Sequence, residues 1–101
     1  MGTAYRRTSP FAGGVATSAR YLIIATSPVT QIIMSSGNQG LSIYNLGTGN
    51  LIWGSTDIAV NSGNYLFVNA RVEWLGLQDQ FSVYTVADSV QTLVAVTEYQ
   101  I

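Results

Sequence analysis

Short runs of β-favouring residues alternate with clusters of turn-forming residues along most of this chain, and this spacing limits what the chain can fold into. Val, Ile and Thr occupy 28 of the 101 positions, and β-branched residues are enriched in strands. Clusters rich in Gly, Asn, Ser and Asp return about every 8 to 12 residues, which is typical of an all-β sandwich or barrel. No helical period is sustained. We therefore expect an all-β fold, a small antiparallel β-sandwich of the jelly-roll or immunoglobulin-like type.

The positions of the runs predict the individual strands. The run at 65–77 is long for one strand, and we expect a bend at Asn69-Ala70 to split it. The runs at 29–34 and 41–45 are interpreted as a pair of strands joined by a Gly-Asn turn. In chain order, the expected strands are 21–25, 29–34, 41–45, 51–54, 57–60, 65–77, 81–87 and 90–99.

The first twenty residues differ from the rest of the chain. They follow no strand or helix period and contain Pro10 and the pair Gly13-Gly14. We expect an extended N-terminal arm over 1–20 and one β-sandwich domain over 21–101, with a disordered terminus as the alternative for the first segment. An arm that becomes ordered against neighbouring molecules would use three apolar anchors and two arginines: Tyr5, Arg6, Arg7, Phe11 and Val15.

The low charge of the chain predicts association with other protein surfaces. Hydrophobic residues make up 48% of the chain and charged residues 9%, against about 25% charged residues in ordinary soluble domains. One small core cannot hide that much apolar surface, so we expect burial against other subunits in a homo-oligomer. The net charge of −1 provides no field for attracting nucleic acid, and no run is long enough to cross a membrane as a helix. We expect neither partner.

The chain lacks most of the residues that catalysis uses, since it contains no His, Cys or Lys. A Ser or Thr nucleophile would therefore have no such side chain as its general base. Three of the carboxylates (Asp57, Asp79 and Asp88) fall in expected turns, where Asp caps its own backbone. The remaining two are Glu73 and Glu98. We expect a protein that is not an enzyme, with no catalytic residues, no cofactor and no metal site.

The aromatic residues permit two interpretations. Buried Trp within apolar strands is the ordinary use of such positions, which predicts a set of core or interface aromatics: Trp53, Trp74, Phe81 and Tyr84. Alternatively, three of the rings could form a platform on which sugars stack: Tyr44, Trp53 and Tyr65.

Alternation and glycine placement recur in six short segments of the chain: 43–45, 52–54, 58–60, 63–66, 81–87 and 94–96. In these segments the chain resembles small β-sandwich proteins of tailed-bacteriophage virions. It differs at Val68-Asn69, where such sequences often have a Pro-Gly turn.

This resemblance implies a location and a role. Proteins of this kind act as capsid decoration (cement) proteins, head-fibre bases or tail components, and assemble as symmetric oligomers, with a trimer as the first expectation. It implies a non-enzymatic structural protein of the virion, made in the host cytoplasm, that binds its own copies and the major capsid protein or another virion protein. The alternative is a carbohydrate- or receptor-binding module of a phage head or tail appendage.

Overall fold

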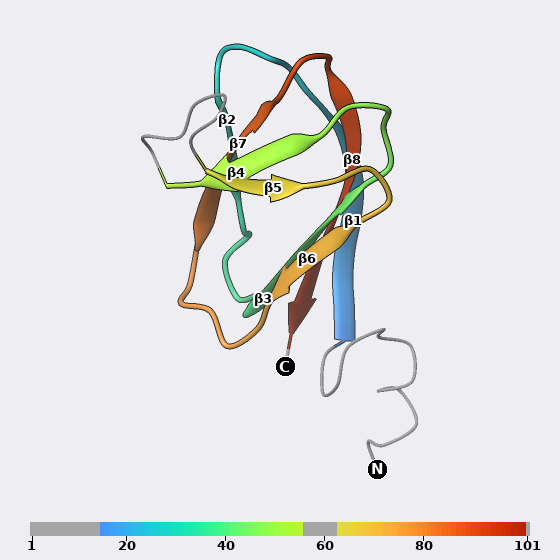
Figure 1. Cartoon of the computed structure of the whole chain (residues 1–101). Helices are drawn as coiled ribbons and strands as arrows, with labels where there is room; N and C mark the ends of the chain where they lie inside the picture. Colours follow the sequence, from blue (N-terminus) through green and yellow to red (C-terminus); the bar gives the residue numbers. More distant parts are fainter. Residues whose placement is uncertain (1–14, 56–62, 101) are drawn as a thin grey trace.

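The computed structural model describes residues 15–55 and 63–100, which form two antiparallel four-stranded sheets packed face to face (Figure 1). Sheet A has the order β1-β8-β3-β6 and sheet B the order β2-β7-β4-β5. No helix occurs in these two ranges, so no described helix could span a membrane. The strands are β1 (Val15–Ile24), β2 (Thr30–Ile33), β3 (Gly40–Asn45), β4 (Leu51–Gly54), β5 (Asn64–Leu66), β6 (Arg71–Trp74), β7 (Ser82–Ala87) and β8 (Thr92–Gln100).

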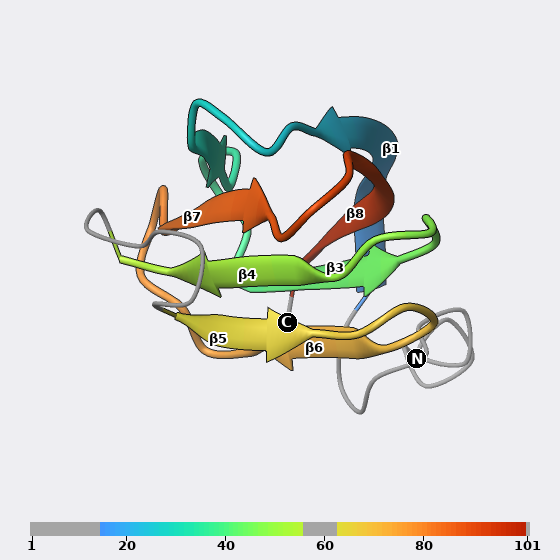
Figure 2. The ribbon, with the colours of Figure 1, turned by 45° about the horizontal axis from the view of Figure 1, so that its top comes forward.

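The strand order identifies the sandwich as a jelly roll. Among the eight described strands, β4 and β5 are the only consecutive pair that lies in one sheet, and every other connection crosses between the sheets. Figure 2 shows β7, β4 and β5 following one another across sheet B. Two four-stranded sheets connected in this way are the double-sheet arrangement of the jelly roll. The β-sandwich predicted from the sequence is thus confirmed, and the topology selects the first of its two expected types.

Most of the expected strands are present, with shifts at their ends. The bend at Asn69-Ala70 is confirmed, since Asn69 has a φ of 67° and separates β5 from β6. β1 begins at Val15, so residues 15–20, assigned to the arm from the sequence, belong to the sheet. The expected strand at 57–60 and residues 1–14 lie outside the described ranges.

The predicted pairing of the runs at 29–34 and 41–45 is wrong. β2 pairs with β7 in sheet B, whereas β3 pairs with β6 and β8 in sheet A. The segment between β2 and β3 therefore crosses from one sheet to the other. A Gly-Asn turn between two β-rich runs favours a hairpin locally, but it carries no information on which face the second run will bury.

The core lies between the sheets and is built from alternate residues of the strands. Trp53 of β4 and Trp74 of β6 meet across it edge to face, with ring centroids 5.0 Å apart, and Trp74 also lies 5.8 Å from the ring of Phe81. All three aromatic side chains are partly buried and pack against the main apolar cluster. The buried members of that cluster are Ile24, Ile32, Met34, Leu41, Ile43, Leu51, Leu66, Val83, Ala87, Val94 and Val96.

Removal of the Trp74 ring tests this packing. We expect Trp74→Ala to lower the free energy of unfolding by about 3–5 kcal/mol, because emptying a large aromatic site leaves a cavity facing Trp53 and Phe81. Phe67→Ala serves as the control, since Phe67 is 61% exposed and a surface change costs within about 0.5 kcal/mol. Urea denaturation at one fixed protein concentration measures both. Equal losses in the two variants would contradict the proposed role of Trp74.

Candidate functional site

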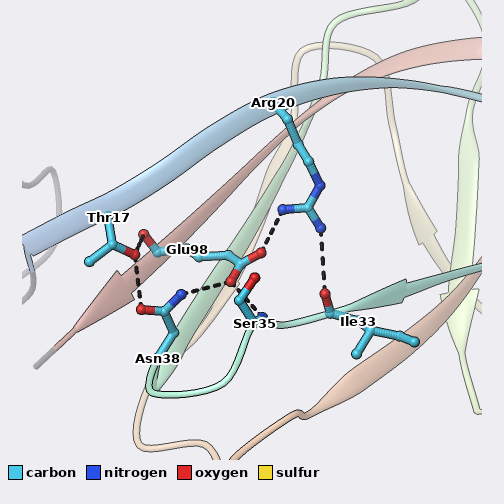
Figure 3. A network of polar contacts seen from close by, with 6 residues as sticks. All are labelled: Thr17, Arg20, Ile33, Ser35, Asn38 and Glu98. Atoms are coloured by element: carbon cyan, nitrogen blue, oxygen red, sulfur yellow. Dashed lines mark hydrogen bonds and ion pairs between the residues drawn. The ribbon is translucent and has the colours of Figure 1, made fainter.

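A fully buried carboxylate, Glu98 of β8, lies at the end of the sandwich where β2 connects to β3 (Figure 3). Its Oε1 accepts hydrogen bonds from the Ser35 backbone N–H at 2.7 Å and from Asn38 Nδ2 at 2.8 Å. Its Oε2 pairs with the Arg20 guanidinium, which comes from β1. Both carboxylate oxygens are therefore occupied by donors of the protein itself.

The environment of Glu98 favours the ionised carboxylate. Burial raises the pKa of the Glu98 carboxyl, but the hydrogen bonds from Arg20, Ser35 and Asn38 and the charge of Arg20 together outweigh burial and hold the pKa below its ordinary value. Thr17 extends the network by donating to Asn38 Oδ1 at 2.9 Å. Such a carboxylate joins β1, β8 and the β2–β3 connection, and both of its oxygens accept hydrogen bonds from within the chain.

A second carboxylate, Asp79, lies at the surface of the same end of the sandwich. Asp79 accepts hydrogen bonds from the Gly37 backbone N–H at 2.9 Å and from the Ser36 hydroxyl at 3.3 Å. It thereby links the β2–β3 connection to the β6–β7 connection. A shallow pocket of about 280 Å³ lies beside it. Within the described ranges, no three His, Cys, Asp or Glu side chains gather where they could hold a metal ion.

A buried amide, Asn45 at the end of β3, organises the opposite end of the sandwich. Its Nδ2 donates to the backbone carbonyls of Gly49 at 2.9 Å and Leu66 at 3.0 Å. Its Oδ1 accepts from the Thr92 hydroxyl at 2.7 Å and from the Gly47 N–H at 3.2 Å. Gly47 is required here because a Cβ at this position would lie 2.0 Å from Thr92 Oγ1.

The outward face of sheet A carries an exposed apolar patch, which we call the sheet A patch. Strand register places its side chains in two rows, since Tyr21 and Tyr44 both face Ala95, while Ile23 faces Leu93. The Leu46 N–H completes the second row by bonding the Leu93 carbonyl. The patch consists of Tyr21, Ile23, Tyr44, Leu46 and Leu93, all of them exposed.

The most exposed part of the sheet A patch lies on β1. Tyr21 and Ile23 are 70% and 64% exposed, the highest values among the exposed large hydrophobic side chains of the described residues. A pocket of about 300 Å³ opens at this end of the patch, and Ile23, Leu46 and Leu93 contribute its apolar lining. The patch thus combines an exposed apolar surface with a recess at one end.

The aromatic residues singled out from the sequence are not gathered in one place. Tyr44 faces outward from sheet A, Tyr65 faces outward from sheet B, and Trp53 packs against the core between them. The proposed three-ring platform is therefore not assembled. Tyr84 packs against a second buried cluster formed by Ile52 and Val86.

Tyr65 has a different aromatic neighbour, which the sequence analysis did not select. The Phe67 ring lies 6.1 Å from the Tyr65 ring at an interplanar angle of 27°, and both rings are exposed. Their i, i+2 spacing along an expected strand was the available signal, because such residues share one face.

The anchors expected in the N-terminal arm are largely beyond the described residues. Tyr5, Arg6, Arg7 and Phe11 fall in 1–14, whereas Val15 is the first residue of β1. The Arg20–Glu98 pair was also missed. Its signal was the position of Glu98 on the same side of the last strand as Val94 and Val96, where a charge requires a partner.

Comparison with known proteins found no match among family models, curated proteins or solved structures. The resemblance to phage virion proteins stays a prediction from the sequence.

The buried carboxylate makes stability depend on pH in a defined direction. Because the folded pKa of Glu98 lies below the ordinary value of 4.5, its contribution is fully present above that pH and is lost as pH falls through the folded pKa. We expect Glu98→Gln to lower the free energy of unfolding by about 2–4 kcal/mol at neutral pH, since it leaves the Arg20 charge without its partner.

Denaturant titrations of the wild type and Glu98→Gln over a series of pH values measure this contribution. The difference between the two proteins should narrow below pH 4.5. Glu73→Gln makes the same chemical change at an exposed position on β6 and should cost less than about 0.5 kcal/mol. A difference for Glu98→Gln that stayed constant down to the acid limit would refute the assignment.

Proposed function

We propose that this chain is a non-enzymatic structural protein of a virus particle, a capsid decoration or cement protein that binds the shell and its own copies. The observation that carries the proposal is the sheet A patch, an exposed apolar face formed on paired strands of sheet A. Exposed apolar patches of this kind mark sites of protein–protein contact. The low charge of the chain also costs little electrostatic repulsion when many copies crowd together.

The fold supports this proposal by analogy. Jelly rolls occur in viral capsid proteins, lectin domains and cupins, so the architecture is compatible with a capsid role and does not by itself assign one. The resemblance of segments such as 52–54 and 81–87 to virion proteins points in the same direction. A metal-dependent cupin activity would need a ligand cluster, and the residues described in sheets A and B offer none.

The carboxylates described above support a structural role. The carboxylate oxygens of Glu98 and Asp79 accept hydrogen bonds from donors within the chain, and both side chains hold connections between the sheets in place. A carboxylate that acts on a substrate must instead reach the reacting atom within hydrogen-bond distance.

Binding to viral shells tests the proposal. The intact chain should co-sediment with capsids that were assembled without it from the virus that encodes it. Deletion of residues 2–14 should weaken this binding about tenfold or more, a change of about 1.4 kcal/mol. The deletion stops at residue 14 because β1 begins at Val15. Circular dichroism and melting should remain those of the intact protein.

Two outcomes of this assay would count against the proposal. An intact chain that stays in the supernatant at every capsid concentration would refute binding to the shell. A truncated chain that binds as tightly as the intact one would show that the arm plays no part in attachment.

A carbohydrate-binding module is the second candidate, and the stacked pair Tyr65 and Phe67 favours it. Exposed aromatic faces are surfaces on which sugar rings stack, and lectin domains also use the jelly roll. This pair replaces the platform expected from the sequence.

A glycan array decides between the two candidates. For a structural protein we expect no signal above that of Phe67→Ala, because the pair would then have no sugar to bind. Phe67→Ala should fold normally, since its ring is 61% exposed. A saccharide that binds the wild type and is lost in Phe67→Ala, but not in the sheet A variant Tyr44→Ala, would establish the second candidate instead.

A further inference from the structure

We propose that the outer edge of β1 binds the β1 strand of a second copy of this chain. The two β1 strands would run antiparallel and be related by a two-fold axis. Pairing of this kind would join the two A sheets into one sheet of eight strands. The inference rests on the part of the proposed function that has the chain binding its own copies, and it names the surface that does so.

The backbone of β1 is an open template for another strand. Among the described strands, β1 is the end strand of sheet A and pairs only with β8. It has ten residues, whereas the other end strands, β2, β5 and β6, have four, three and four. A long edge presents a row of backbone N–H and C=O groups that a further strand can bind.

Two of the usual protections of an edge strand occur on β1, and both lie before Tyr21. Proteins block such edges with Lys, Pro, charges that point outward or inward, or bulges. β1 contains neither Lys nor Pro, and its one charged residue is Arg20, whose guanidinium is paired with Glu98. The one irregularity lies between Ala16 and Ser18, so the strand is regular from Ser18 to Ile24.

The outward side chains of β1 suit a second copy of the same strand. Tyr21 and Ile23 are the most exposed part of the sheet A patch. In an antiparallel pair, facing side chains lie about 4.5–5.5 Å apart, so Tyr21 and Ile23 of one copy would lie beside side chains of the second copy's β1. No like charges would be brought together, because the Arg20 charge is already paired with Glu98.

The anchor of the arm that lies nearest to β1 cannot reach the apolar pocket of its own chain. The apolar pocket includes Ile23, which is eight residues, or about 27 Å, along β1 from Val15. Phe11 is four residues before Val15 and can reach at most about 14 Å from it. The Phe11 of the same chain therefore cannot fill this pocket.

A second copy places a different part of β1 beside the pocket. If the two-fold axis passes Ala19, the part of the second copy's β1 that precedes Ser18, where the bulge lies, runs alongside Ile23. An antiparallel β1 pair is an isologous contact, so it closes as a dimer and not as the trimer that the family resemblance implies.

Charge placed on the edge tests the proposal. Sedimentation analysis of the wild type should give twice the mass of the chain. Ile23→Lys and Tyr21→Lys should each raise the dimer dissociation constant at least tenfold, while their monomers keep the wild-type fold because both side chains are exposed. Phe67→Lys is the matched control, being 61% exposed on a different surface, and should leave the dimer unchanged.

Disulfide trapping tests the strand pairing directly, because the chain has no Cys of its own. Ala19→Cys and Tyr21→Cys, alone and mixed, should give one combination that crosslinks between copies at least tenfold faster than Gln31→Cys, an exposed position on β2. Facing residues of an antiparallel pair meet the Cα distance that a disulfide needs, about 4.4–6.8 Å.

Three results would overturn the inference: a monomer or trimer mass, an unchanged dimer in both lysine variants, or crosslinking no faster than in Gln31→Cys. These results are independent of the capsid assay. A chain that dimerises through β1 but does not bind capsids would refute the virion role and support the β1 dimer. A chain that binds capsids but forms no β1 pair would refute the β1 dimer and support the virion role.

Discussion

The pairing of the buried Glu98 carboxylate with the partly exposed Arg20 is the interaction on which the arrangement of the two sheets depends most. In this jelly roll nearly every connection crosses between the sheets, so each end of the sandwich must carry backbone that no strand partner satisfies. The Glu98 carboxylate binds the Ser35 N–H within one such crossing. At the other end, the Asn45 amide serves the turn after β3 and the carbonyl of Leu66. Two buried polar side chains thus supply what the strand ladders leave unpaired.

Local pattern predicted the strands well because each one depends on its own residues. The alternation in 41–45 and 81–87 is enough to define β3 and β7, and the positive φ of Asn69 fits the bend expected beside Ala70. Strand partners depend on residues far away in the chain. The pairing of β2 with β7, and that of Arg20 with Glu98, join positions at least 49 residues apart, which turn chemistry does not encode.

For the sheet A patch as well, the sequence predicted one property and not another. Composition alone predicted an excess of apolar surface, since charged residues make up only 9% of the chain. It did not indicate where the excess lies. The rows of the sheet A patch are brought together by β8, which places Ala95 between Tyr21 and Tyr44. The three-ring platform was not assembled because Trp53 takes an inward position on β4 and packs against Trp74.

The partnership of β1 with β8 has a consequence for the order of events during synthesis. The first described strand finds its partner in the last, with Ile24 opposite Thr92 and Val15 opposite Gln100. On the ribosome, β1 emerges long before β8 exists, and β3 also waits for β8 as one of its two neighbours. Contacts between such distant segments form slowly. Sheet A is therefore completed only after almost the whole described chain has left the exit tunnel, while β1 stays unpaired in the nascent chain.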